Sequence, residues 1–495
     1  MNALLVYPQC PDSYWSFRHA LSFQGKRAAQ PPLGLLTVAA LLPASWDRRL
    51  VDTNVEPLKE ADLVWADVVL LSGMLIQRDP LLSIVRRCRA RGVRTVVGGP
   101  ISSSLTPDEL EADHIVIGEA EGLVAALARD IERGVAQPVY CAAERPSMEQ
   151  SPLPDLSLVR MKRYGTMTVQ YSRGCPFNCE FCNIVEIYGR RPRTKAVAQV
   201  LAELDQLCAA GWRGPVFIVD DNFIGNKVRV RELLSALIEW QREHQYLFRF
   251  ITEASLNLAD DEELLHAMRD AGFASVFLGI ETPSEASLAA ANKLQNTRRD
   301  MLASIARIQS FGMEVMGGFI LGFDTDSEDV FERLVQFIQK SAIPIAMVGL
   351  LQAIPNTRLF QRLSREGRVL DTGGGNNTSC ELNFRPHMNA DRLIEGYRFV
   401  LRRIYSGDAY FERVREYLSR CRPHYGAHFS LANVRALFFS LMRQGVIGKA
   451  RLSYWKFLLA ALTRYRDCFG AAMTMAVMGY HFQVVTEQIV SAEPS

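Results

Sequence analysis

The stretch that decides the fold is YSRGCPFNCEFCNI, residues 171–184, in which three cysteines stand at CxxxCxxC spacing. It directly follows a short apolar run, residues 166–171, with the composition of a buried β-strand. The stretch therefore forms the loop at the carboxyl end of a strand, where parallel βα folds carry their ligand sites. Its thiols are Cys175, Cys179 and Cys182. We expect them to converge on one inorganic centre.

The number of ligands indicates which centre this is. A cubane [4Fe–4S] cluster held by three cysteines keeps one iron open to a substrate or cofactor. Structural zinc usually takes a fourth protein ligand. Between Glu144 and Trp240 there is no histidine, and the one further cysteine, Cys208, lies in a helix-like run outside the loop. The spacing favours the cluster, with zinc or three unliganded cysteines as the alternatives.

Around this loop the chain repeats strand-like and helix-like segments. We see no internal repeat of the solenoid type in the sequence. Downstream of the loop, each strand candidate is separated from the next by about one helix and two loops. This order predicts a partial (β/α)6 barrel of the TIM type over residues 161–370, with its site at the carboxyl ends of the strands. The six strand candidates are residues 166–171, 215–219, 248–252, 275–279, 314–319 and 346–351.

Upstream of the barrel, residues 1–143 alternate short Val, Ile and Leu runs with amphipathic stretches. That pattern is typical of an α/β, doubly wound, Rossmann-like domain with a parallel sheet. Its strand ends lead into the loops at residues 72–74, 98–100 and 118–119, where glycine lets a ligand approach the backbone. These glycines could equally be simple βα turns. Residues 144–160, rich in proline, predict a linker.

Downstream of the barrel, residues 371–495 predict a C-terminal helical domain that caps it. Residues 392–482 are rich in arginine, aromatics and methionine at helical spacing. Within them, residues 451–483 are basic and aromatic, so they could cover an apolar substrate or touch a membrane surface. Ordinary core packing of amphipathic helices is the favoured explanation.

The composition excludes several classes of protein. The 495 residues carry 56 Lys and Arg against 54 Asp and Glu, which gives no bulk electrostatic reason to bind nucleic acid. The first ten residues lack the pattern of a secretory signal. No apolar run approaches the roughly 20 residues of a membrane span, so we expect no transmembrane segment. Ten scattered cysteines without an export signal predict a reducing, cytoplasmic location.

Several motifs together resemble one enzyme superfamily. The CxxxCxxC loop after the first barrel strand, with Phe181 just before Cys182, resembles the radical S-adenosylmethionine (SAM) superfamily. GIET at residues 279–282 and GGFILGFD at residues 317–324 are similar to its fourth- and fifth-strand signatures. The sequence of loops in residues 1–143 resembles the cobalamin-binding domain of one subgroup, and the C-terminal region resembles the cap of a branch that includes hopanoid methylases.

This resemblance implies three cofactors: a [4Fe–4S] cluster, SAM and cobalamin. The three cysteines would hold the cluster and act as the catalytic metal ligands, and Phe181 would lie against adenine. Glu253 and Glu281, at the ends of the third and fourth barrel strands, would contact SAM or else form salt bridges inside the barrel. The candidate cobalamin contacts are Ser72, Gly73, Met74, Gln77, Gly98, Gly99, Gly118 and Glu119.

The sequence departs from the family pattern in one respect. Cobalamin domains that supply a lower axial histidine carry Asp-x-His-x-x-Gly, whereas residues 1–143 contain only His19 and His114, neither in that setting. We therefore expect cobalamin to bind by apolar enclosure, with no protein nitrogen on its cobalt. A domain that has lost cobalamin is the alternative.

The implied activity is methylation of a poorly activated carbon by a cobalamin-dependent radical SAM methyltransferase. It needs a small-molecule substrate, possibly apolar, and an electron donor such as flavodoxin or ferredoxin. Two other functions use the same features: a radical SAM enzyme that performs a cyclisation or rearrangement, and a non-catalytic carrier or sensor. The acidic pair Asp220 and Asp221, with Asn222, follows the second barrel strand, where it would contact SAM or substrate or cap a helix.

Overall fold

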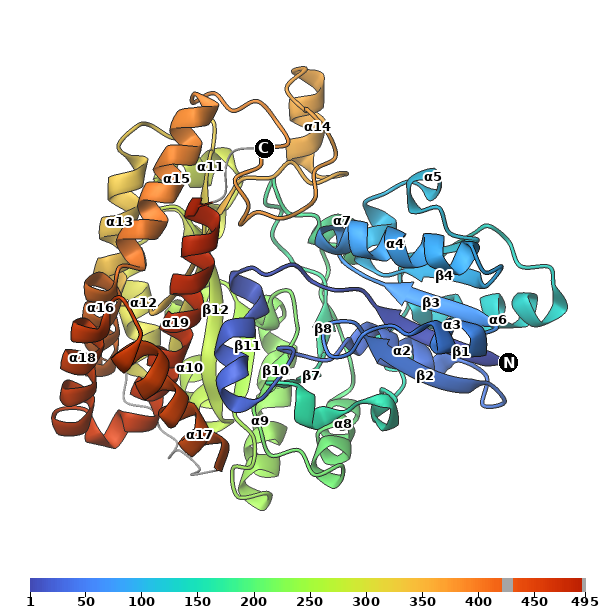
Figure 1. Ribbon diagram of the computed structural model, residues 1–495, viewed down its shortest axis with the longest axis horizontal. Coiled ribbons are helices and arrows are strands. Elements are labelled where there is room, and N and C mark those ends of the chain that lie inside the picture. Colours follow the sequence, from blue (N-terminus) through green and yellow to red (C-terminus); the bar gives the residue numbers. More distant parts are fainter. Residues whose placement is uncertain (421–430, 492–495) are drawn as a thin grey trace.

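The structure is a computed structural model that describes residues 1–420 and 431–491. It confirms the predicted α/β architecture with a C-terminal helical region. In Figure 1 the N-terminal sheet lies at the right, the barrel strands in the centre, and the cap helices at the left.

The first sheet has six parallel strands in the order β2-β1-β3-β4-β5-β6. Alternate residues of its central strand β3 enter two separate cores, Val68 and Leu70 on one face and Val69 and Leu71 on the other. Helices on both faces make it the expected doubly wound sheet. Its strands are β1 (Asn2–Tyr7), β2 (Asp47–Asp52), β3 (Val68–Ser72), β4 (Arg94–Gly98), β5 (His114–Ile117) and β6 (Val139–Cys141). Its helices are α2 (Leu33–Leu41), α3 (Glu60–Trp65), α4 (Arg78–Arg89), α5 (Pro107–Leu110) and α6 (Val124–Arg133).

The second sheet has six parallel strands in the order β14-β13-β12-β11-β10-β7, so that neighbours along the chain are neighbours in space. Its end strands β7 and β14 do not pair with each other, which makes the barrel partial. All six predicted strands are present. They are β7 (Met167–Val169), β10 (Val216–Ile218), β11 (Phe250–Ala254), β12 (Phe273–Glu281), β13 (Glu314–Leu321) and β14 (Ile345–Leu350). The helices between them are α7 (Ile184–Tyr188), α8 (Val197–Ala209), α9 (Lys227–Glu243), α10 (Glu262–Asp270), α11 (Glu285–Ala290), α12 (Met301–Ser310) and α13 (Val330–Ser341).

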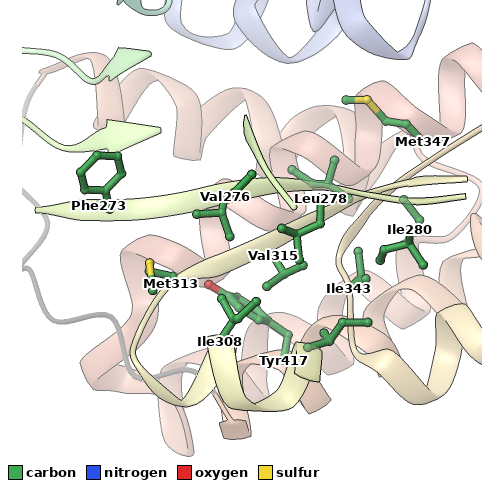
Figure 2. Close-up of a cluster of buried hydrophobic side chains, with 14 of the residues drawn as sticks. Phe273, Val276, Leu278, Ile280, Ile308, Met313, Val315, Ile343, Met347 and Tyr417 are labelled. Carbon is green, nitrogen blue, oxygen red and sulfur yellow. The ribbon is translucent and has the colours of Figure 1, made fainter. Parts of the chain in front are cut away.

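The outer face of the barrel sheet is the main core of the molecule. Figure 2 shows Val276, Leu278 and Ile280 of β12 packed with residues from α12 and from the cap. Because successive side chains of a strand point to opposite faces, the residues between them, Phe277 and Gly279, face the concave side. Phe277 and Gly279 are only half-buried, so the concave side is less tightly filled than the outer one.

The cap covers the edge strand β14, every residue of which is buried. Two tyrosines, one in α15 and one directly after it, donate hydrogen bonds to that strand: Tyr397 Oη to Val348 O at 3.3 Å and Tyr405 Oη to Ala346 O at 2.6 Å. The edge is therefore not open to another chain. After β14 comes α14 (Arg358–Arg365), and the cap helices are α15 (Ala390–Ile404), α16 (Gly407–Arg420), α17 (Leu431–Ser440), α18 (Arg451–Thr463) and α19 (Phe469–Ser491).

The connection between β1 and α2 leaves the first sheet and packs against the cap, where α1 (Arg18–Leu21) lies beside α19 in Figure 1. Tyr14 is fully buried there, and its hydroxyl lies 2.7 Å from Thr486 Oγ1. Its ring packs with Tyr405 and Phe482. The beginning and the end of the described chain are thus joined by an aromatic cluster.

The C-terminal apolar stretch is longer than the sequence suggested. It forms part of α19. Among the described residues, the helical segment Arg466–Ser491 is long and apolar enough to cross a membrane. Length and composition alone are weak grounds for a span, because core helices pass the same test. Here Met475, Phe482 and Val485 of α19 are buried in the main core.

Candidate functional site

The three cysteines lie in a loop that closes at its base through a short antiparallel ribbon, β8 (Ser172–Arg173) paired with β9 (Arg193–Thr194). Gly174, next to the first cysteine, has φ +100°, and a Cβ there would lie 2.8 Å from Gly189 O. The turn into the loop therefore requires glycine. Cys175 N then donates to Gly189 O at 3.2 Å, which holds the beginning of the loop to its end.

The polar residues after β10 hold this loop. The Asp220 carboxylate accepts hydrogen bonds from the backbone N–H groups of Tyr171 and Ser172 and from Ser172 Oγ, at 2.6 to 2.9 Å. Asp221 accepts from Gly174 N at 3.0 Å. Burial raises the pKa of Asp220 to about 7 and that of Asp221 to about 6.

Asn222 completes this support, because its Nδ2 donates to Ser255 Oγ at 3.2 Å and lies 3.9 Å from Cys175 Sγ. Although Asn222 precedes the short helix η9 (Phe223–Gly225), its side chain does not cap it. The sequence predicted that these residues contact SAM or substrate, or that Asp221 or Asn222 caps a helix. In the structure Asn222 makes no such cap, and the three side chains hold the cysteine loop.

The three thiols influence one another and are largely desolvated. Burial, together with the neighbouring Cys179 and Cys175, raises the pKa of Cys182 to about 12. Within the described part of the chain, no three or more His, Cys, Asp or Glu side chains form a group that could hold a metal ion. The ligands of a cubane bind separate irons, so they need not meet at one point. Three cysteines in one loop, with no fourth ligand among them, are the donor set of a cluster with one open iron.

A buried ion pair lies beside the thiols. The sequence analysis singled out its carboxylate, Glu281, but not its lysine. Lys293 Nζ is 2.7 Å from Glu281 Oε1, and both side chains are almost fully buried. Burial alone would lower the pKa of Lys293, but the charges of Glu281 and Cys179 raise it overall. Glu281 has φ +66°, and the register of β12 shifts there. Such strain in a residue other than glycine is typical of functional positions.

The two remaining residues predicted to contact SAM lie on the same side of the barrel. Phe181 packs 6.2 Å from Phe323, and Lys293 Nζ lies 6.0 Å from the centre of the Phe181 ring. A small hollow lined by Phe181, Phe323 and neighbouring residues opens beside them. Glu253 is half-buried with no hydrogen bond or ion pair recorded in the described structure, and desolvation with the charges of Asp221 and Asp220 raises its pKa to about 8.

At the first sheet, the predicted cobalamin contacts lie at the carboxyl ends of β3, β4 and β5. Gln77 is fully buried and ties two loops together, donating to Pro8 O at 2.6 Å and accepting from Met74 N at 2.9 Å. Gly99 has φ +80°, and a Cβ there would collide with Ser72 Oγ. Gly118 has φ +99° with open space around it. Gly73 and Gly98 lie in the same strand ends, and Met74 is exposed.

Glu119 joins the two sheets. Its carboxylate pairs with Arg173 at 2.6 Å and with Arg193, while Glu121 pairs with Arg173 at 2.8 Å. All four side chains are largely buried, and Arg173 lies two residues before Cys175. Thus a residue predicted to touch cobalamin binds the cysteine loop in this structure. Arg173 and Arg193 were missed by sequence reasoning, although both flank the cysteine motif.

The strand ends of the glycine-lined sheet thus meet the three-cysteine loop of a partial barrel. This combination defines a cobalamin-dependent radical SAM enzyme. Family models agree: residues 28–128 match the B12 binding domain, residues 169–338 match the radical SAM superfamily, and residues 357–494 match a domain of unknown function, DUF4070.

Two relatives cover nearly the whole chain. The chain is 41 % identical to an uncharacterized methyltransferase of Synechocystis over 99 % of its own length and 93 % of the relative's. It is 37 % identical to the hopanoid C-2 methylase of Rhodopseudomonas palustris over 93 % and 89 %. The chain therefore belongs to the family of cobalamin-dependent radical SAM methyltransferases that includes this methylase.

Solved structures show the same fold at low identity. The radical SAM methyltransferase TsrM of Kitasatospora setae, determined with cobalamin and a [4Fe–4S] cluster, superposes with a TM-score of 0.63 at 14 % identity, over 94 % of this chain and 99 % of that one. The cobalamin-dependent enzyme OxsB gives 0.62 at 13 %, over 99 % and 79 %. The cofactors are a [4Fe–4S] cluster, SAM and cobalamin. Methyl transfer is the function, rather than cyclisation, rearrangement or a carrier role.

Proposed function

We propose that this enzyme methylates a poorly activated carbon of a hopanoid or a closely similar polycyclic lipid. The observation that carries the proposal is the 37 % identity to a hopanoid C-2 methylase along nearly the full length of both chains. The match extends through the C-terminal region, so the substrate-side cap is shared as well as the cofactor domains.

The concave side of the barrel supports an apolar substrate. Phe277 and Met316 face it from neighbouring strands and are only half-buried. A Cβ at Gly318 would lie 2.8 Å from the Phe277 ring, so glycine there makes room for that ring. Trp15, from the segment that crosses from the first sheet, lies 5.0 Å from Phe277 and is 42 % exposed. Aromatic and thioether groups of this kind suit a rigid hydrocarbon better than a charged substrate.

Each predicted site residue has a proposed role. When bound, the cluster and SAM supply an oxidising carbon radical, and cobalamin supplies the methyl group. Cys175, Cys179 and Cys182 hold the cluster, and Phe181 packs against adenine. Glu253, whose raised pKa keeps it protonated near neutral pH, donates a hydrogen bond to SAM, and Glu281 accepts one. The proposed cobalamin contacts are Ser72, Gly73, Met74, Gln77, Gly98, Gly99, Gly118 and Glu119.

We also propose the domain division 1–143, 144–160, 161–370 and 371–495. The three family matches support it, although the third begins at residue 357, before the proposed cap. The enzyme works in the cytoplasm with a flavodoxin- or ferredoxin-type electron donor, because the open cluster needs reduction and the cysteines need a reducing compartment.

The test uses the anaerobically reconstituted, reduced holoenzyme with a hopanoid and SAM that carries a deuterated methyl group. We expect a hopanoid product that is heavier by the labelled methyl, together with 5′-deoxyadenosine. The variant with alanine at Cys175, Cys179 and Cys182 is the control and should form neither. Cleavage of SAM without label in any hopanoid would contradict the proposed substrate, while leaving the assignment as a methyltransferase intact.

A further inference from the structure

Helix α18 is apolar on both its inner and its outer face. Tyr454, Phe457, Leu458 and Ala461 are buried in the main core. On the other side Leu452, Leu459 and Leu462 are 72 %, 64 % and 55 % exposed. A surface helix of a globular protein normally turns a polar face outward. Core packing, which the sequence predicted, therefore explains the apolar inner face of α18 but not its apolar outer face.

The exposed apolar residues form a continuous row. Their spacing at positions 452, 455, 459 and 462 places them along one side of the helix. Trp455, 47 % exposed, donates from Nε1 to Gly445 O at 2.9 Å, which connects the row to the short π-helix η12 (Leu441–Val446) between α17 and α18. Exposed apolar residues continue there and into α17. We call the set the outer apolar face: Val434, Phe438, Met442, Val446, Ile447, Leu452, Trp455, Leu459 and Leu462.

The same segment is strongly basic. Residues 431–466 contain seven cations and no acidic residue, in a chain with a formal net charge of only +2. Arg451 and Lys456 are exposed on either side of the row on α18. The seven cations are Arg435, Arg443, Lys449, Arg451, Lys456, Arg464 and Arg466.

We propose that the outer apolar face docks onto the surface of a lipid bilayer that contains anionic headgroups. Apolar side chains would enter the boundary between headgroups and acyl chains, and the cations beside them would contact lipid phosphates. Tryptophan at the rim of such a face suits this boundary, since its ring is apolar and its N–H is polar.

The charge argues for lipid rather than for a second copy of the chain. Two of the cations already pair with acidic residues outside the segment, Lys449 with Glu487 and Arg466 with Asp467. Packing two such faces together would bring the remaining cations, Arg451 and Lys456 among them, against one another with no acidic residue in the segment to pair with them. Figure 1 also places α17 and α18 on the side of the molecule away from the N-terminal sheet, so docking there leaves the contact between the two sheets free. This proposal rests on exposure and charge and does not depend on the proposed substrate.

The experiment measures binding of the full-length chain to vesicles by co-sedimentation. We expect binding to vesicles of phosphatidylglycerol with phosphatidylcholine that weakens at high salt, and weaker binding to phosphatidylcholine alone. L452S/L459S should lower the partition coefficient on both vesicles at least about tenfold, because two exposed leucine side chains no longer enter the apolar part of the bilayer. R451Q/K456Q should lower it roughly 30-fold on the anionic vesicles only, because two cations that contact lipid phosphates are lost.

The matched control is V64S/V228S, which removes two valines that are 74 % and 71 % exposed outside the outer apolar face. It should bind as the unmodified chain does. Three results would overturn the proposal: no binding of the unmodified chain to anionic vesicles, equal loss in the control, or a dimer in light scattering that L452S/L459S disperses. The last would assign the face to a second copy. None of these readouts uses catalysis, so failure here is distinct from failure of the proposed function.

Discussion

The two parallel sheets each have six strands, yet they build their sites differently. In the first sheet the strand order reverses at β1, whereas in the second it runs without reversal from β7 to β14. A reversal leaves a crevice at the strand ends, while an unbroken order curls the sheet so that its strand ends converge. The proposed cobalamin site has glycine at the ends of β4 and β5, Gly99 and Gly118, whereas the cysteine loop is held by side chains such as those of Asp220 and Asp221.

The difference teaches how each cofactor is held. A cluster is bound through covalent bonds to thiolates, so the surrounding residues need only fix the loop, as Asp220 and Asp221 do here. A large flat cofactor is held by shape and by hydrogen bonds to its rim. The glycines at the strand ends are therefore important, because they leave room for the cofactor against the backbone. The two sites should therefore fail independently when each is altered.

The largest effect is expected at the cysteine loop. If these thiols are the ligands of the cluster, as proposed, replacing Cys175, Cys179 and Cys182 together by alanine should abolish the cluster completely, while cobalamin remains bound. Iron and sulfide analysis after reconstitution should fall from about four of each per chain to background. Retained iron at wild-type level, or stoichiometric zinc in the unmodified protein, would show that the ligands are wrongly assigned.

At the first sheet we expect a smaller, graded loss. G118A adds a methyl group where the protein leaves open space, so it should lower cobalamin affinity roughly 10- to 100-fold by overpacking the cofactor. G134A is the matched control, because Gly134 also has positive φ and open space but ends α6. Both should lose about 1–2 kcal/mol of stability from backbone strain. Equal cobalamin retention by the two variants in absorbance titrations would remove Gly118 from the site.

The ion pairs between the first sheet and the cysteine loop should control how the two sites are placed relative to each other. R173K keeps the charge but loses the paired hydrogen bonds to Glu119 and Glu121. We expect the ratio of 5′-deoxyadenosine to methylated product to rise several-fold, since a radical formed at a misplaced cluster is quenched before methyl transfer. The change in that ratio separates positioning from simple instability. An unchanged ratio would show that Arg173 supports the fold alone.

The smallest effect is expected where α19 contacts the connection between β1 and α2. His481 is fully buried with Nε2 3.1 Å from Tyr14 O, and desolvation lowers its pKa to about 4. Between pH 6.5 and 4 the unfolded chain binds a proton that the folded chain does not, so stability falls as the pH decreases. The loss should be roughly 2 kcal/mol at pH 5 and absent at pH 7.

Denaturant unfolding of the unmodified chain and of H481Q at both pH values checks this. Glutamine keeps a polar group near Tyr14 O but does not titrate, so H481Q should lose less stability between pH 7 and pH 5 than the unmodified chain does. The same loss in both would assign the acid sensitivity to other groups.

The sequence by itself determined the order of strands and helices, because burial of a parallel sheet on both faces imposes continuous apolar runs that are visible residue by residue. It also determined the cysteine loop, since three ligands close together in the chain need no tertiary information. The same local logic placed Glu281 at a strand end, as the structure shows, whereas Phe181 was singled out through the resemblance to the radical SAM superfamily. It missed the short edge strand β6, whose three residues give too weak a pattern.

Only the tertiary structure decided which polar groups meet. Glu119 and Arg173 are 54 residues apart in the chain, and Tyr14 and Thr486 are 472 apart, so no local pattern relates them. The partner of a charged side chain depends on where separate elements pack. The outer face of α18 shows the same limit: apolar residues occur on both sides of this helix, and only the packed fold distinguishes Phe457, buried in the core, from Leu459, left at the surface.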